Sequence, residues 1–233
     1  MKFLNKVLSK KLPKLKLQDS DLGKIGLISI NGKKVTFEEF SKMENLTVKG
    51  NLNLRETALE KLPKGLKVGG NLWLNGSKIK ELPSGLTVDG DLYLRGSKIK
   101  ELPSGLKVGG SLELSDSAIK ELPSGLTVDG YLNLSGSKIK ELPSGLKVGG
   151  NLGLYGTAIK ELPSGLTVGG NLDLYRTAIK ELPSGLKVGG DLSLYRTAIK
   201  ELPEDLKVKG QIWISPEMKK TFGKFKSKVK VFL

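Results

Sequence analysis

Apolar and polar residues follow one pattern that returns every 20 residues over most of the chain. An apolar-x-apolar triplet, such as Leu72-x-Leu74, recurs nine times, from Leu52/Leu54 to Ile212/Ile214. Residues two apart on a strand point to the same side, so each triplet predicts a short strand with one apolar face. A fixed period of this length predicts a solenoid, in which strands of successive coils pair in parallel and bury stacked rows of the same side chain.

Glycine and proline mark the two ends of each predicted strand region. A second apolar pair, Leu66-x-Val68 in one coil, is followed by Gly69-Gly70, and the second of these positions is glycine in every coil. This glycine predicts a corner or a close approach of chain to chain. The alternative is one continuous strand from Leu66 to Leu74. Leu82-Pro83 then makes the other turn, and its proline argues against regular helices on the outer face.

A hydroxyl-bearing residue stands three positions after the second strand leucine in seven coils. We expect these hydroxyls to bond backbone groups of the turn and of the next coil, a structural role. The column consists of Ser77, Ser97, Ser117, Ser137, Thr157, Thr177 and Thr197.

The combined pattern, Leu72-x-Leu74-x-x-Ser77-x-Ile79-x-x-Leu82-Pro83, resembles the leucine-rich repeat over residues 46–214. Its length and its Leu-Pro resemble the short bacterial and phage-type repeats, including those of secreted bacterial effectors. The resemblance implies a mainly β solenoid of about nine coils with a parallel sheet. Ser or Thr replaces the family's Asn, and Gly69 replaces its first strand leucine, so a straighter β-helix is the alternative to a curved array.

The two ends of the chain depart from the repeat and predict caps, since a solenoid must cover its terminal apolar rows. Residues 1–45 predict a small α/β cap: a basic amphipathic helix over 1–12, a hairpin turning at Asn31-Gly32, and a short helix from Phe37. A capping box joining Thr36 and Glu39 is expected to start that helix.

Residues 215–233 predict a basic C-terminal cap that begins with a short helix, with Ser215 at its N-cap and Pro216 after it. The helix over 1–12 has a second interpretation, as a membrane-surface or partner-docking helix. We favour the cap.

Composition excludes several kinds of chemistry. The 233 residues contain no Cys and no His, which excludes disulfides, Cys/His metal sites, thiol catalysis and histidine general-base catalysis. Carboxylates recur with the repeat and have no matching base or phosphate-binding loop. We therefore expect no enzyme activity, no cofactor and no metal.

The formal net charge of +15 lies mainly at the ends, with +6 in residues 1–50 and +5 in residues 204–233. This suggests an anionic partner only weakly. No stretch approaches the roughly 20 apolar residues of a membrane span, and the charged start lacks a signal-peptide core. We expect a protein of the cytoplasm, or one delivered to a host cell.

Lysine and glutamate form adjacent columns along the array, from Lys80/Glu81 to Lys200/Glu201. This pairing predicts a solvated, mutually screened surface. A nucleic-acid groove should instead interleave Lys or Arg with aromatic residues and lack a neighbouring acidic row. A nucleic-acid partner is therefore not expected.

The positions between and beside the strand leucines vary most from coil to coil. They predict a single sheet face rich in Trp, Tyr and Arg, the residue types that most often anchor interfaces. In leucine-rich repeat proteins this face is the usual binding face. The alternative is that the aromatic residues only stabilise the sheet as cross-strand neighbours. The candidate partner-binding residues are Trp73, Tyr93, Arg95, Tyr131, Tyr155, Tyr175, Arg176, Tyr195, Arg196 and Trp213.

The sequence thus favours a non-enzymatic scaffold that binds a protein partner through its varied strand face. The second hypothesis is a binder of anionic surfaces, nucleic acid or membrane, through the Lys-rich termini. A membrane contact would run through residues 1–12. The two hypotheses differ in salt dependence, because electrostatic binding weakens steeply as salt rises.

Overall fold

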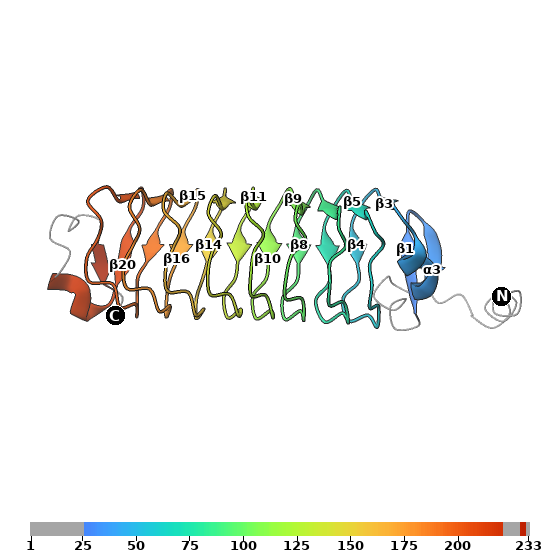
Figure 1. Ribbon diagram of the computed structural model, residues 1–233, viewed down its shortest axis with the longest axis horizontal. Coiled ribbons are helices and arrows are strands. Elements are labelled where there is room, and N and C mark those ends of the chain that lie inside the picture. The colour runs from blue at the N-terminus through green and yellow to red at the C-terminus, as the bar shows by residue number, and fades with distance from the viewer. Residues whose placement is uncertain (1–25, 221–228, 232–233) are drawn as a thin grey trace, which may run out of the picture.

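The chain folds into a curved β-solenoid, seen in a computed structural model that describes residues 26–220 and 229–231. Coil follows coil along one axis, with the cap at one end and the C-terminal segment at the other (Figure 1). Each coil spans 20 residues, as the pattern predicts, and contributes one strand to each of two parallel sheets. The fold is therefore mainly β, with two parallel sheets where the pattern predicts one.

The main sheet, formed by the Leu-x-Leu triplets, has ten strands in the described part of the chain. They are β4 (Leu52–Asn53), β6 (Leu72–Trp73), β8 (Leu92–Tyr93), β10 (Leu112–Glu113), β12 (Leu132–Asn133), β14 (Leu152–Gly153), β16 (Leu172–Asp173), β18 (Leu192–Ser193), β20 (Ile212–Ile214) and β21 (Val229–Val231). From β4 to β20 every residue pairs with the residue 20 positions on, so identical positions form straight columns.

The second sheet has nine strands among the described residues and lies across the corner from the main sheet. They are β3 (Thr47–Val48), β5 (Lys67–Val68), β7 (Thr87–Val88), β9 (Lys107–Val108), β11 (Thr127–Val128), β13 (Lys147–Val148), β15 (Thr167–Val168), β17 (Lys187–Val188) and β19 (Lys207–Val208). The corner at the glycine pair is thus confirmed, and the alternative of one continuous strand is wrong.

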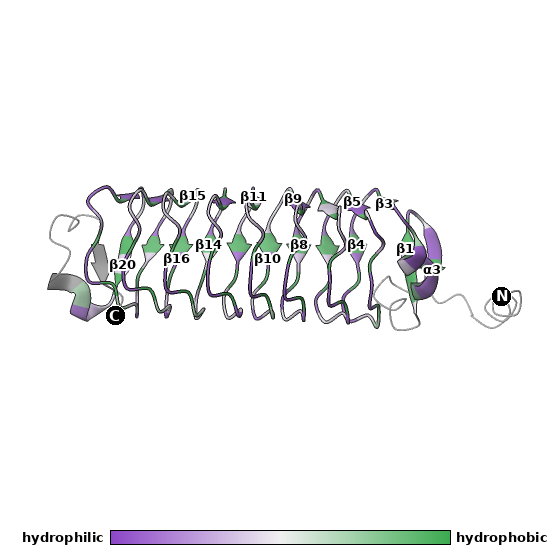
Figure 2. Cartoon of the chain, in the orientation of Figure 1, coloured by the Kyte–Doolittle hydropathy of each residue, from purple (hydrophilic) through white to green (hydrophobic). Residues whose placement is uncertain are grey.

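The core is a set of stacked leucine, valine and isoleucine rows inside the coils. Leu72, Leu74 and Val68 are at most 1% exposed, and Ile79 from the strand-free side closes the same interior. The main-sheet strands stand out as apolar against the more polar loops in Figure 2. Burying one such side chain contributes about 1.5–3 kcal/mol, so the repeated rows are the main source of stability.

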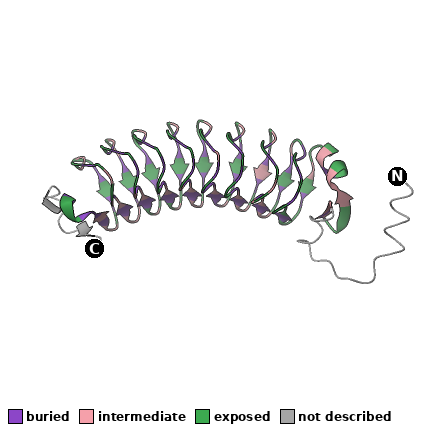
Figure 3. Ribbon diagram, turned by 90° about the horizontal axis from the view of Figure 1, so that it is seen from below, coloured by how far each residue is buried: buried purple, intermediate pink, exposed green. Residues whose placement is uncertain are grey.

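The array is an arc rather than a straight rod. Figure 3 shows the main sheet along the inner, concave edge and the second sheet behind it. The structure therefore favours the curved form over the straighter β-helix that was the alternative.

The corner glycines make room for a neighbouring coil. A Cβ on Gly150 would lie 2.8 Å from the carbonyl C and O of Gly130 and 2.9 Å from the backbone N of Tyr131. The Gly150 N–H meanwhile donates to the Gly130 carbonyl at 2.9 Å. Close chain approach, one of the two predicted reasons for glycine here, is confirmed.

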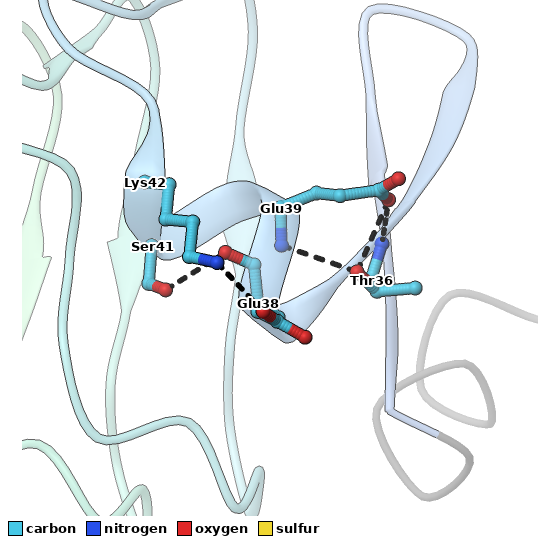
Figure 4. Close-up of polar contacts among 5 residues, drawn as sticks. All are labelled: Thr36, Glu38, Glu39, Ser41 and Lys42. Carbon is cyan, nitrogen blue, oxygen red and sulfur yellow. Dashed lines mark hydrogen bonds and ion pairs between the residues drawn. The ribbon is translucent and has the colours of Figure 1, made fainter. Parts of the chain in front are cut away.

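The N-terminal cap has the predicted hairpin and helix. Strand β1 (Leu27–Ile30) pairs antiparallel with β2 (Lys33–Thr36) across Asn31-Gly32, both at positive φ as a type I′ turn requires. Helix α3 (Phe37–Lys42) follows. Figure 4 shows its capping box: the Glu39 N–H donates to the Thr36 hydroxyl, and the Glu39 carboxylate accepts from the Thr36 N–H at 2.9 Å.

The hairpin turn attaches to the open edge of the second sheet through one side chain. The Asn31 amide group donates to the Thr47 carbonyl at 2.9 Å, and its oxygen accepts from the Lys49 N–H at 3.1 Å. Asn31 thus replaces the coil that β3 lacks on that side. This contact is a physical reason to regard the hairpin as a cap.

Asn31→Gly is expected to lower the free energy of unfolding by about 1–3 kcal/mol, because glycine keeps the positive φ but removes both edge bonds. Urea denaturation followed by circular dichroism measures the change. Lys33→Gly, on an exposed position of the same hairpin, is the control and should cost less. An equal loss in both variants would mean that the edge bonds contribute nothing.

The C-terminal cap is only partly as predicted. Strand β21 pairs in parallel with β20 and so covers the last edge of the main sheet. The expected helix is the 3₁₀ helix η2 (Pro216–Lys220), and the Ser215 hydroxyl accepts from the Arg196 N–H at 2.9 Å. Ser215 therefore ties η2 to the preceding coil. The predicted helix over 1–12 and most of the basic tail lie outside the described residues.

The hydroxyl column is structural, but within its own coil. The hydroxyl of Thr157 donates to the carbonyl of Leu154 at 2.8 Å, and those of Thr177 and Thr197 bond likewise. The expected bonds from these threonine hydroxyls to the next coil are absent among the described residues. The lysine and glutamate columns from Lys80/Glu81 to Lys200/Glu201 are exposed, and no ion pair joins them in that described stretch.

Candidate functional site

The variable residues of the sheet lie on the concave face. In each triplet the two apolar side chains are buried, while the residue between them, as in Leu72-Trp73-Leu74, is partly exposed on the opposite side. Register alignment places these residues in one column across the sheet. The column is flanked by the residues two positions before and two positions after, so three varied columns run side by side.

The first aromatic cluster lies near the N-terminal end of the concave face. Trp73 and Tyr93 stack with ring centroids 5.7 Å apart and planes within 6°, and the Arg55 guanidinium lies 5.0 Å from the Trp73 ring centre. The Tyr93 hydroxyl donates to Asp91 at 2.9 Å. This hydrogen bond raises the pKa of Tyr93 to about 12. The cluster is thus held rigid from both sides.

Arg95 and Tyr131, two further predicted site residues, lie apart from the stacked rings. Arg95 is exposed and pairs with Asp116 at 3.3 Å. Tyr131 is partly buried, and burial raises its pKa. Neither residue joins an aromatic stack in the described structure.

The column before the strands, expected to vary for binding, instead has a structural function. Its side-chain oxygens accept the backbone N–H of the same position one coil on, as Asn151 does for Asn171 at 2.8 Å. This ladder is interrupted at Tyr131, whose ring offers no acceptor there. The ladder bonds join Asn51 to Asn71, Asn71 to Asp91, Asp91 to Ser111, Ser111 to Tyr131, Asn151 to Asn171, Asn171 to Asp191 and Asp191 to Gln211.

The second aromatic cluster lies at the C-terminal end, in the column after the strands. Tyr155, Tyr175 and Tyr195 form a continuous stack with centroid separations of 5.0 and 5.2 Å. The Arg176 guanidinium lies 5.9 Å from the Tyr175 ring centre, and the Arg196 guanidinium lies 5.6 Å from that of Tyr195. Such cation–π contacts contribute about 0.5–1 kcal/mol each at exposed sites.

The two arginines occupy a backbone position that is glycine in four other coils. Arg176 and Arg196 have φ of 57° and 56°, whereas Gly76, Gly136 and their equivalents hold the same turn. For a residue with a side chain this conformation costs about 1–2 kcal/mol. The coils therefore carry arginine here at a cost in stability.

A hollow of about 410 Å³ lies beside the tyrosine stack. Its lining joins the three columns of the last coils, because Asp173, Ser193 and Trp213 are neighbours in the middle column of β16, β18 and β20. Tyr175 and Tyr195 form the wall on one side. Trp213, predicted as a separate contact, thus belongs to this cluster.

The sequence-predicted residues therefore gather into two groups, one around Trp73 and one around Tyr175. Residues that the sequence reasoning left out complete both groups: Arg55 and Asp91 in the first, and Asp173 and Asp191 in the second. Their signal was their membership of the three varied columns. Charge was overlooked there because aromatic residues alone defined the candidates.

Among the described residues, no group of three or more acidic side chains is placed to hold a metal ion. None of the helices in residues 26–220 is long and apolar enough to cross a membrane. Comparisons of the chain with models of protein families, with curated proteins and with solved structures gave no match. The class of protein that the fold defines is a parallel β-solenoid of 20-residue coils.

Proposed function

We propose that this protein is a leucine-rich-repeat scaffold without enzyme activity, which binds a protein partner on the concave face of its main sheet. The observation that carries the proposal is the C-terminal cluster of three stacked tyrosines and two arginines. Trp, Tyr and Arg dominate the residues that contribute most to protein–protein binding. The leucine-rich repeat resemblance of residues 46–214 supports the same face.

The geometry of this cluster suits binding, because the side chains are ordered before a partner arrives. Association costs about 0.5–1.5 kcal/mol for each flexible side chain that it immobilises. The Tyr175 ring is held between Tyr155 and Tyr195, and the Arg176 Nη1 atom donates to the Tyr155 hydroxyl at 3.4 Å. Much of the ordering cost is therefore already met in the free protein.

Arginine at a positive φ adds a second argument. Stability alone would favour glycine at positions 176 and 196, as in the coils of Gly136 and Gly156. Unfavourable backbone conformations cluster at functional sites, where they position a side chain for its task. Arg176 and Arg196 are thus the residues for which binding offers a reason and folding does not.

The alternative function, binding of an anionic surface through the Lys-rich termini, draws on net charges of +6 in residues 1–50 and +5 in 204–233. It predicts that removal of salt-sensitive contacts ends binding, whereas the aromatic cluster would be dispensable. The two functions therefore separate in one experiment.

Replacing Tyr175 and Tyr195 together with alanine is expected to reduce partner capture at least about tenfold, at both low and high salt, because it removes two anchor side chains. The measurement is photo-crosslinking from a benzoyl-phenylalanine introduced at Asn133 on the concave face, in lysate of the native host. The same crosslinker at Thr127, exposed on β11 of the second sheet, is the matched control. Adducts from Thr127 alone, or capture that the tyrosine substitutions leave unchanged, would refute the proposal.

A further inference from the structure

We propose that the hollow beside Tyr175 and Tyr195 binds a lysine or arginine side chain of the protein partner. This inference rests on the proposed function and names the chemistry of the contact. The hollow has a volume of about 410 Å³, within the range of pockets that enclose a small ligand. Its lining combines aromatic rings with two carboxylates, and it contains no basic side chain among the described residues.

The hollow exists because a small residue stands between larger ones. Ser193 on β18 lies between Asp173 on β16 and Trp213 on β20 in the middle column. The tyrosine pair bounds one side, and Asn171 and Asp191 of the ladder column are part of the same lining. A side chain entering over Ser193 therefore meets rings and carboxylates together.

Both carboxylates are fixed in position by N–H groups. Asp191 accepts from the Gln211 N–H at 2.8 Å through Oδ1 and from the Trp213 indole N–H at 3.3 Å through Oδ2. Asp173 accepts from the Tyr175 N–H at 2.9 Å through Oδ1. Its Oδ2 has no hydrogen-bond partner within residues 26–220, so it can accept a charge-assisted hydrogen bond from an entering ammonium or guanidinium.

The charges select the occupant. The protein carries +15 overall, yet the only ionised groups that line this hollow are acidic. Arg176 and Arg196 lie over the tyrosine rings but do not line the hollow. Aromatic faces attract cations and carboxylates pair with them, whereas an acidic or purely apolar side chain would leave two charges desolvated.

Charge can be removed here without removing structure. Asn171 already makes the ladder bond that Asp191 makes one coil later, and Asn133 accepts from the backbone N–H two residues on, as Asp173 does. Asp191→Asn and Asp173→Asn are therefore expected to fold like the parent protein. Asp129→Asn, on the far side of the coil at the second sheet, is the matched control.

The test uses Trp213 as its reporter, since Trp73→Phe leaves it the sole tryptophan of the chain. The probes are acetylated, amidated pentapeptides Gly-Ser-X-Ser-Gly in which X is lysine, arginine, norleucine or glutamate. The lysine or arginine peptide should change Trp213 fluorescence with saturation, and norleucine and glutamate peptides should bind at least about tenfold more weakly. Asp173→Asn and Asp191→Asn should each weaken the basic peptide about tenfold, and Asp129→Asn less than about twofold.

Equal binding of the norleucine peptide, or unchanged binding by both Asn variants, would overturn the inference. Binding that appears only after Lys224, Lys226 and Lys228 are replaced by alanine would also overturn it, because the occupant would then be the chain's own segment. Crosslinking from Asn133 that persists in the Asp173→Asn and Asp191→Asn variants would leave the proposed function standing while this inference fails.

Discussion

Gly150→Ala is expected to lower the free energy of unfolding by about 3 kcal/mol or more, whereas Gly50→Ala should change it by less than about 1 kcal/mol. Both glycines occupy the same corner column, and neither has a positive φ, so the conformational cost of alanine is the same at both. They differ in one respect, because only Gly150 has a preceding coil packed against its Cα.

The physical reason is the rigidity of the obstacle. The new methyl carbon at Gly150 would meet the backbone of Gly130 and Tyr131 at 2.8–2.9 Å, and a backbone held in two sheets cannot swing aside. At most other corners the nearest atom belongs to a ladder side chain, as Asn151 does at Gly170. Tyr131 provides no such side chain, so Gly150 tests the contact between backbones directly.

Guanidinium denaturation followed by circular dichroism measures both variants. A retained fold with a reduced midpoint is the expected result for Gly150→Ala, together with an unchanged midpoint for Gly50→Ala. Comparable losses would show that glycine is needed at the corner for its conformational freedom and not for the approach of the next coil.

The fold could be predicted from the sequence because its determinants are local or repeat at a fixed distance. Asn31-Gly32 requires a tight turn whatever surrounds it, and the Thr36–Glu39 capping box needs only three residues of separation. The Leu72-x-Leu74 spacing predicts its strand, and the period sets the register without any further information. These signals survive because each is complete within one coil.

The candidate site was predicted less completely, because its contacts join different columns as well as different coils. The hollow over Ser193 depends on Asp173 and Trp213 being its strand neighbours, a relation of 20 residues in either direction. The structural use of the Asn171 column was missed for a related reason. A side chain that bonds the next coil's backbone resembles a freely varying surface residue until the register is known.

The ladder also shows how one substitution can affect two columns. The side-chain oxygen of Asn151 accepts from the Asn171 N–H and occupies the space that a Cβ at Gly170 would need. Glycine at the corner and a short polar residue after it are thus one device. The variation allowed in that column is restricted to acceptors such as Asn, Asp and Ser, with Tyr131 as the exception.

Leu132→Ala, at the centre of the array, is expected to lower the free energy of unfolding by about 2–5 kcal/mol and to divide unfolding into two steps. Leu132 is fully buried and pairs in register with Leu112 on one side and Leu152 on the other. Each coil contacts mainly its neighbours, so a cavity in this strand weakens both of the interfaces that hold the two halves together. Leu52 is equally buried but lies on the edge strand β4, which pairs only with β6 in the main sheet.

Hydrogen exchange measured by mass spectrometry distinguishes the two positions. In Leu132→Ala the amides of β10, β12 and β14 should lose protection first, while in Leu52→Ala the loss should remain near β4 and β6. Asn133→Ala, on the partly exposed face of the same strand, is the surface control and should alter protection little. Uniform loss along residues 46–214 in Leu132→Ala would mean that the array unfolds as one cooperative unit. The concave face would then depend on every coil at once, and a partner could not be bound by the C-terminal coils alone.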